Sequence, residues 1–165
     1  MADFKPAVEK ILKYEGGYVN NPDDYGRETN FGISKRQYPN RDIKGLTRDD
    51  AIRIYYDDYW CKFLGDKISS QAVAEELMDS AVNMGWHRAG TFLQEALNFL
   101  TGSALLVDGL VGPKTIDAAN AYKYPKALVT VLNGLQFEHY RAIVEKDPTQ
   151  IEFLRSWLAR VELNA

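Results

Sequence analysis

The sequence predicts a mainly α-helical fold of six to seven helices, with a short β-hairpin or irregular loop pair after the first helix. Two observations carry this prediction. Apolar residues recur at helical spacing in almost every segment between turn signals. Residues 18–33 lack that period, and turn-forming residues cluster there at 20–24 and at Gly26. At 165 residues we expect one compact domain, because the chain is long enough for one core and too short for two ordinary domains.

The first helix is predicted from a capping residue and a stripe that ends in an acid. Asp3 can cap it, and Phe4, Val8, Ile11 and Glu15 lie on one face of a 3.6-residue period. A further helix, from Ser69 or Ser70 to Gly85, is apolar most of the way round, which is typical of a central helix. A short helix is expected at 34–39, capped by Ser34 and stopped by Pro39, and another helix at 47–59, where Thr47 and Asp50 make a capping box. The remaining helices are expected at 89–101, from 113, at 125–147 and at 151–161.

The acid at the end of the first stripe is the first candidate for chemistry. Gly16 and Gly17 follow Glu15 directly, and a glycine pair is a common helix stop. Apolar neighbours and the negative end of the helix dipole both raise a carboxyl pKa, so a Glu in this position can act as a general acid near neutral pH. The alternative is an exposed helix-end residue without a catalytic role.

Composition and charge exclude several function classes. A net charge of -3, with no basic stripe, gives no support for nucleic-acid binding. One Cys forms no internal disulfide, and two scattered His residues do not make a zinc site, so we expect no metal and no cofactor. No run approaches the roughly 20 apolar residues of a membrane span, and no signal peptide is visible, so we expect synthesis in the cytoplasm without membrane insertion.

Two more residues near Glu15 complete a hydrolytic set. Asp24 and Thr29 follow it within the turn-rich segment. A glycosidase uses a pair of carboxyl groups, one to protonate the leaving oxygen and one to act on water or on the sugar, and a hydroxyl can help to hold that water.

The same segment resembles a known family, the bacterial and phage N-acetylmuramidases of glycoside hydrolase family 108, sometimes labelled secretion activators. The resemblance is carried by Glu-Gly-Gly-Tyr at 15–18, Asn-Pro-Asp-Asp-Tyr-Gly-Arg-Glu-Thr at 21–29 and Asn-Phe-Gly-Ile-Ser at 30–34. It continues at 59–60, at 79–85 and at 107–115, where the sequence is similar to the family's C-terminal peptidoglycan-binding-type segment.

The resemblance implies a lysozyme-like fold and cleavage of the β-1,4 bond between N-acetylmuramic acid and N-acetylglucosamine. Glu15 would protonate the glycosidic oxygen, Asp24 would orient or deprotonate water, and Thr29 would help to position it. The chain departs from the family pattern where Asn21 replaces an Asp and Arg27 replaces a Gly, and an inward Arg27 would favour ionised Asp24. Inversion or retention depends on the separation of the two carboxyls, and we lean to inversion.

The implied organisation is a catalytic lobe at 1–85, with Glu15 and the hairpin, and a C-terminal helical lobe at 86–165. Asn83 is the expected residue of the cleft wall between them. Core packing remains an equal alternative for each aromatic candidate. The expected substrate-binding residues are Tyr18, Tyr25, Asn30, Trp60, Asn83 and Trp86.

The expected partner is the glycan strand of peptidoglycan, bound by a monomer. A phage or prophage lysis enzyme that reaches the wall through a separate holin or export system fits this expectation. The main alternative is a non-catalytic wall-binding or secretion-associated adaptor on the same scaffold. A calcium or phosphate loop at 108–113 lacks the acidic ladder of an EF-hand and the Gly-Lys-Ser/Thr of a P-loop, so a structural turn is favoured there.

Overall fold

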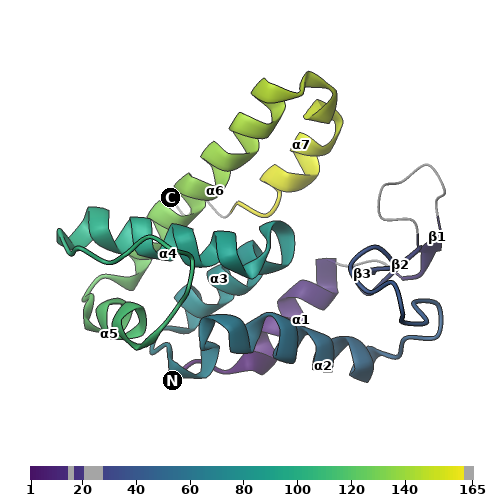
Figure 1. Cartoon of the computed structure of the whole chain (residues 1–165), viewed down its shortest axis with the longest axis horizontal. Helices are drawn as coiled ribbons and strands as arrows, with labels where there is room; N and C mark the ends of the chain where they lie inside the picture. The colour runs from purple at the N-terminus through teal and green to yellow at the C-terminus, as the bar shows by residue number, and fades with distance from the viewer. Residues whose placement is uncertain (15–16, 21–27, 162–165) are drawn as a thin grey trace.

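Seven α-helices and one small antiparallel sheet make up the described part of this computed structural model, residues 1–14, 17–20 and 28–161 (Figure 1). This confirms a mainly α fold with a short sheet after the first helix. The α-helices are α1 (Phe4–Tyr14), α2 (Arg48–Asp58), α3 (Gln71–Met84), α4 (Trp86–Thr101), α5 (Pro113–Ala121), α6 (Pro125–Lys146) and α7 (Ile151–Leu158). The 3-10 turns are η1 (Trp60–Phe63), η2 (Gly65–Lys67) and η3 (Pro148–Gln150), and the strands are β1 (Val19–Asn20), β2 (Glu28–Asn30) and β3 (Ile33–Ser34).

Helix α3 is the central helix, as its sequence predicts. It contacts α1, α4 and α6, and its Ala74, Leu77, Met78 and Ala81 are all fully buried. Its first turn is capped by the Ser70 hydroxyl, which accepts a hydrogen bond from the Val73 amide. Buried apolar residues from α1, α2, α3, α4 and α6 belong to one contiguous cluster, so the core runs through both halves of the chain.

Helix α1 buries the predicted stripe. Ala7, Val8 and Ile11 are almost fully buried, and the Asp3 side chain accepts the Lys5 amide at 3.0 Å. The start of α1 is tied to α3 because Gln71 exchanges two hydrogen bonds with the Asp3 backbone. These contacts fix the direction in which α1 runs, and Figure 1 shows that its C-terminal end lies toward the sheet.

The sheet has the order β1-β2-β3, with Val19 opposite Thr29 and Thr29 opposite Ser34. Two side chains fasten it to the helical body. The Tyr55 hydroxyl of α2 donates to the Phe31 carbonyl at 2.8 Å, at the turn between β2 and β3. The Asn30 amide donates to the Ile43 carbonyl at 3.1 Å.

Residues 34–39 do not form the predicted short helix. Ser34 belongs to β3, and the following turn has one helical hydrogen bond, from the Tyr38 amide to the Ser34 carbonyl at 3.0 Å. Pro39 then has no N–H with which to continue the pattern. By contrast, the capping box predicted at Thr47 and Asp50 is present at the start of α2.

Helices α6 and α7 form a hairpin that projects from the body on the side opposite α2 (Figure 1). The Tyr140 ring of α6 stacks on the Trp157 ring of α7 at 5.2 Å between centroids, with 23° between their planes. Among the described residues, no helix combines the length and the apolar character needed to cross a bilayer.

Candidate active site

The candidate catalytic segment begins where α1 ends, at Tyr14, and continues through the small sheet. Glu15, Asp24, Tyr25 and Arg27 lie outside the described residues, so their predicted roles stay predictions. The structure does place the two elements that flank them. The chain enters this segment from a helix with a buried apolar face and leaves it through the central strand of the sheet.

Thr29 is the described member of the predicted catalytic set, and it sits in the middle of the sheet. Side chains alternate between the faces of a strand, so Thr29 shares one face with its cross-strand partners Val19 and Ser34. Thr29 is half-buried. The Ser34 hydroxyl on the same face accepts a hydrogen bond from the backbone amide of Gln37 at 3.3 Å.

Tyr18 and Asn30 belong to the other face. The Tyr18 hydroxyl donates to Glu28 at 2.9 Å, and the Lys44 ammonium lies 5.9 Å from the Tyr18 ring centre. Asn30 is only 6% exposed, and its amide also lies within 3.5 Å of the Lys44 and Leu46 carbonyls. Asn30 therefore holds the 43–46 loop against the sheet, and it is not a side chain presented to a substrate.

Beyond Gln37 lies a pocket of about 330 Å³ between the β3–α2 loop, the end of α2 and the start of α4. Gly85 has φ of +86°, a backbone conformation that only glycine adopts readily, and this turn joins α3 to α4. It places the half-buried Trp86 in the wall of the pocket. The full lining is Gln37, Tyr38, Asp58, Tyr59, Lys62, Gly85 and Trp86.

The polar groups of this pocket are held in fixed positions. The Tyr38 hydroxyl donates to the Asp58 carboxylate at 2.8 Å, and burial, together with that carboxylate, raises the pKa of Tyr38. Tyr38 therefore stays protonated and remains a donor at any physiological pH. With Lys62 on the same wall, the pocket offers a carboxylate, an ammonium and an aromatic ring, which suits a polar ligand with apolar faces such as a sugar.

Trp86 is thus the predicted sugar platform that lines a pocket, whereas Trp60 does not. Trp60 is fully buried, its ring packs against Phe4 and Phe63, and its Nε1 donates to Asp66 at 2.8 Å. This corrects the prediction that Trp60 binds substrate. The structural reason is that 3-10 turn η1 turns its indole into the core, where Gly65 lies directly against the ring.

Asn83 is exposed near the end of α3, as predicted, but its amide is already engaged. It donates to the Asp79 carboxylate at 3.0 Å and to the Asp79 carbonyl at 2.9 Å. Asp79 is 4% exposed, and its carboxylate also accepts hydrogen bonds from Arg160 and Gln136, each at 3.3 Å. Asn83 therefore covers a buried polar cluster that connects α3, α6 and the turn after α7.

Sequence reasoning missed Gln37, Tyr38, Asp58 and Lys62. Tyr38 precedes a proline and Asp58 ends an amphipathic helix, and both patterns are typical of ordinary turns and surfaces. They come together only where the β3–α2 loop meets the end of α2, η1 and the α3–α4 junction. No group of His, Cys, Asp and Glu within the described ranges is arranged to hold a metal ion.

Comparison with known proteins gives two family matches in sequence order. Residues 8–85 match the model described as glycosyl hydrolase 108, and residues 88–162 match a predicted peptidoglycan domain. No curated protein gives a significant match. Among solved structures, SagA of Brucella abortus is similar, with 28% identity and a TM-score of 0.78, over 96% of this chain and 88% of that one. The similarity supports a lysozyme-like fold over nearly the whole chain.

Proposed function

We propose that this protein is an N-acetylmuramidase, because residues 8–85 match the glycosyl hydrolase 108 model and residues 88–162 match the predicted peptidoglycan domain model. It cleaves the β-1,4 bond between N-acetylmuramic acid and N-acetylglucosamine in peptidoglycan. The observation that carries the proposal is that the matched hydrolase region contains Glu15, Asp24 and Thr29 in order, from the residue that follows α1 in the sequence to the central strand of the sheet.

In the proposed reaction, Glu15 donates its proton to the glycosidic oxygen as the bond to the muramic acid carbon breaks. Asp24 orients or deprotonates the attacking water, and Thr29 holds that water by its hydroxyl. The buried face of α1 supports the proposed role of Glu15, since Glu15 directly follows that face in the sequence and apolar neighbours raise the pKa of a carboxyl group. We favour inversion of the anomeric centre.

The pocket at Trp86 is the proposed site for one sugar of the glycan strand. The Trp86 ring supplies an apolar platform, the Asp58 carboxylate and the Tyr38 oxygen accept hydrogen bonds from sugar hydroxyls, and the Gln37 side-chain amide donates one. Ser34 and Gln37 connect the Thr29 face of the sheet to this pocket. A strand bound at Trp86 would therefore extend toward Thr29.

The test is loss of turbidity of purified peptidoglycan, with analysis of the new reducing ends. The wild-type protein should clear the suspension and release reducing N-acetylmuramic acid, and Glu15→Gln should lose at least about a hundredfold in rate, because a general acid contributes 10²–10⁴-fold. Glu95→Gln is the matched control, since Glu95 is exposed on α4, and it should retain the wild-type rate.

Two results would contradict the proposal in different ways. Equal clearing by Glu15→Gln would remove Glu15 from the mechanism. Binding to peptidoglycan without release of reducing ends, on several wall types, would instead favour the non-catalytic adaptor.

A further inference from the structure

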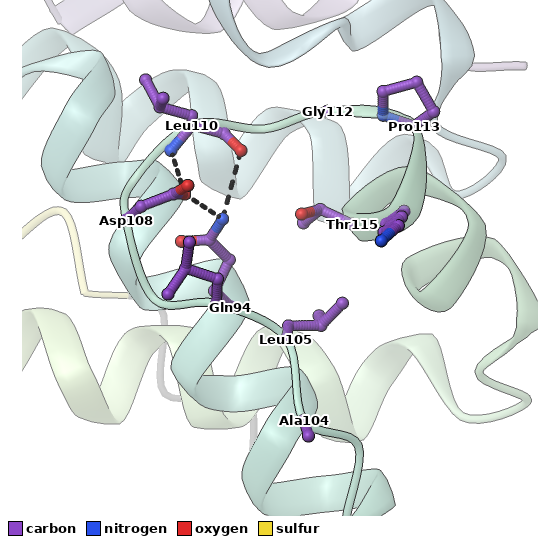
Figure 2. Close-up of a pocket in the computed structure, with 10 residues that line it drawn as sticks. Gln94, Ala104, Leu105, Asp108, Leu110, Gly112, Pro113 and Thr115 are labelled. Carbon is purple, nitrogen blue, oxygen red and sulfur yellow. Dashed lines mark hydrogen bonds between the residues drawn. The ribbon is translucent and has the colours of Figure 1, made fainter.

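A second and larger pocket lies in the C-terminal half, between α4, the loop after it and the start of α5. Its volume is about 590 Å³. Figure 2 shows the loop from Ala104 to Pro113 curving around it, with Gln94 of α4 on one side and Thr115 of α5 on the other. None of these residues belongs to the proposed hydrolytic site.

One wall of this pocket is a loop held rigidly by the buried Gln94. Its side-chain oxygen accepts the Gly109 amide at 2.8 Å, and its nitrogen donates to Asp108 at 2.9 Å and to the Leu110 carbonyl at 3.1 Å. Gly109 has φ of +72°, a conformation that favours glycine. Its carbonyl lies so close to Gly90 that a Cβ on residue 90 would be 2.2 Å from the Gly109 carbonyl oxygen. The pocket is therefore preformed.

The opposite wall presents uncapped donors. Helix α5 begins with Pro113, and Gly112 before it has no side chain to cap the first amides, those of Lys114 and Thr115. Thr115 is 4% exposed, and its hydroxyl has no hydrogen-bond partner among the described residues, although hydroxyls of this kind are rarely left unpaired. Figure 2 shows the Thr115 side chain directed toward Gln94 and Asp108. Together with the Lys114 ammonium at its rim, this wall is suited to an anion such as a carboxylate.

The loop wall carries the opposite charge. One oxygen of Asp108 accepts hydrogen bonds from Gln94 and from the Leu110 amide at 2.9 Å, and these bonds lower the pKa of the carboxyl. Within residues 1–14, 17–20 and 28–161, neither Asp108 nor Lys114 forms an ion pair. The pocket thus holds two charges of opposite sign on opposite walls, and Leu105 and Leu110 add apolar lining.

We propose that this pocket binds the free end of a peptidoglycan stem peptide. The peptide's carboxylate bonds to the amides at the start of α5 and to the Thr115 hydroxyl, its ammonium pairs with Asp108, and its aliphatic groups contact Leu105 and Leu110. The ligand's identity rests on the proposed function, because the pocket itself specifies only a short zwitterionic peptide. The peptide stem, rather than the glycan, would then be what the C-terminal half recognises.

The experiment is a titration of the full-length protein with the tetrapeptide L-Ala-γ-D-Glu-meso-diaminopimelate-D-Ala, followed by NMR chemical shifts. The shifts should move at Gly109, Leu110 and Thr115. Thr115→Val keeps the shape and removes the hydroxyl, so binding should weaken about threefold to tenfold. Asp108→Asn should weaken it by about tenfold. When the L-Ala amine of the probe is blocked by acetylation, as it is acylated in the wall, further acetylation of the diaminopimelate amine should remove that difference between the two proteins.

Matched controls test whether these effects belong to the pocket. Thr130→Val makes the same change on α6, where the hydroxyl donates to the Lys126 carbonyl, and it should bind as the wild type does. Lys114→Gln should weaken binding about twofold to fivefold at low salt, while Lys123→Gln, on an exposed lysine after α5, should not. Since both lysines are exposed, these variants remain informative even if Asp108→Asn disturbs the loop.

Shifts that are confined to residues outside the pocket, or equal affinity of the wild type, Thr115→Val and Lys114→Gln, would overturn the inference. The result is separable from the proposed function. Cleavage of peptide-free glycan chains without tetrapeptide binding would remove this inference and leave the muramidase intact. Tetrapeptide binding at the pocket without any cleavage would support this inference and contradict the proposed muramidase activity.

Discussion

Among single residues, Asp79 is a buried carboxylate whose charge is held by hydrogen bonds from several side chains. Its carboxylate is buried beside Arg160, Gln136 and Asn83, and the Glu76 carboxyl is nearby on the same helix. Burial raises the pKa of Asp79, and Arg160, then Gln136, and Lys10 offset part of that rise. The raised pKa means that the folded protein holds this proton more tightly than the unfolded chain does.

The sign of the pH dependence follows from that difference. Between the ordinary value of 3.8 and the raised folded value, the folded state binds more protons, so the contribution of Asp79 to stability falls as pH rises. Asp79→Asn removes the titration. The free energy of unfolding of the wild type minus that of Asp79→Asn should therefore decrease from pH 4 toward neutrality, as measured by urea unfolding at several pH values. A difference that rises with pH would mean that the Arg160 ion pair outweighs burial.

Trp86 is the residue on which the proposed sugar site depends. Removing an aromatic platform costs about 1 kcal/mol of binding, so Trp86→Ala should raise KM about fivefold to tenfold with a smaller change in kcat. Trp86→Phe should recover most of the affinity because it keeps a ring face. Tyr124→Ala, which removes a ring that is 67% exposed elsewhere on the surface, should leave KM unchanged. An unchanged KM for Trp86→Ala in glycan hydrolysis would place the sugar outside this pocket.

Among the elements, α7 and the turn after it are tied to α6 and α3 by interactions of two kinds, a ring stack and an ion pair. The Trp157 ring stacks on Tyr140, and Arg160 pairs with Asp79 at 3.3 Å, with the two side chains 14% and 6% exposed. The same cluster raises the pKa of Tyr140 to about 12, chiefly by burial. Four members of the α7 segment, Ile151, Phe153, Leu158 and Ala159, are exposed, so the helix has little other burial.

This attachment gives a prediction for the element. Trp157→Ala should destabilise the protein by about 2 kcal/mol, less than a fully buried Trp, because the ring is half-buried. Hydrogen exchange should speed up in α7 and at the end of α6 before it changes in α3. Phe153→Ala, at a more exposed ring of the same helix, should have a smaller effect. Uniform loss of protection over the whole chain would show that α7 does not open separately.

Most helices were predictable because their signals are local. The stripe in α1, the capping box of α2 and the ring of apolar positions in α3 each follow from periodicity and caps within one segment. The short helix expected at 34–39 was wrong, since pairing of Ser34 with Thr29 in the sheet overrides the capping signal of Ser34. The pocket residues Tyr38 and Asp58 were missed for the same kind of reason: they meet only in the folded chain.

At the scale of the whole molecule, the two family regions meet at residues 85–88, yet they share one core. Leu77 and Met78 of α3 are fully buried and belong to the same cluster as Leu93 and Leu97 of α4 and Leu128 of α6. The buried Glu76 of α3 accepts a hydrogen bond from Asn133 of α6 at 3.1 Å. The sequence boundary therefore separates two regions that share one hydrophobic core.

A fragment of residues 1–85 should accordingly fail to fold alone, even though it contains the whole matched hydrolase region. Loss of α4 and α6 exposes Leu77 and Met78, at about 1.5–3 kcal/mol for each side chain, and leaves Glu76 without Asn133. For these two side chains alone the loss is about 3–6 kcal/mol, which reaches the lower end of the 5–15 kcal/mol that stabilises a typical domain. The fragment should show no cooperative thermal transition by circular dichroism, whereas the full chain should show one. Adding a separate 86–165 fragment should restore the transition and, with it, the proposed peptidoglycan cleavage. A cooperative melt of 1–85 by itself would mean that the hydrolase region closes its own core, and α3 would then have to pack differently from its arrangement in the full chain.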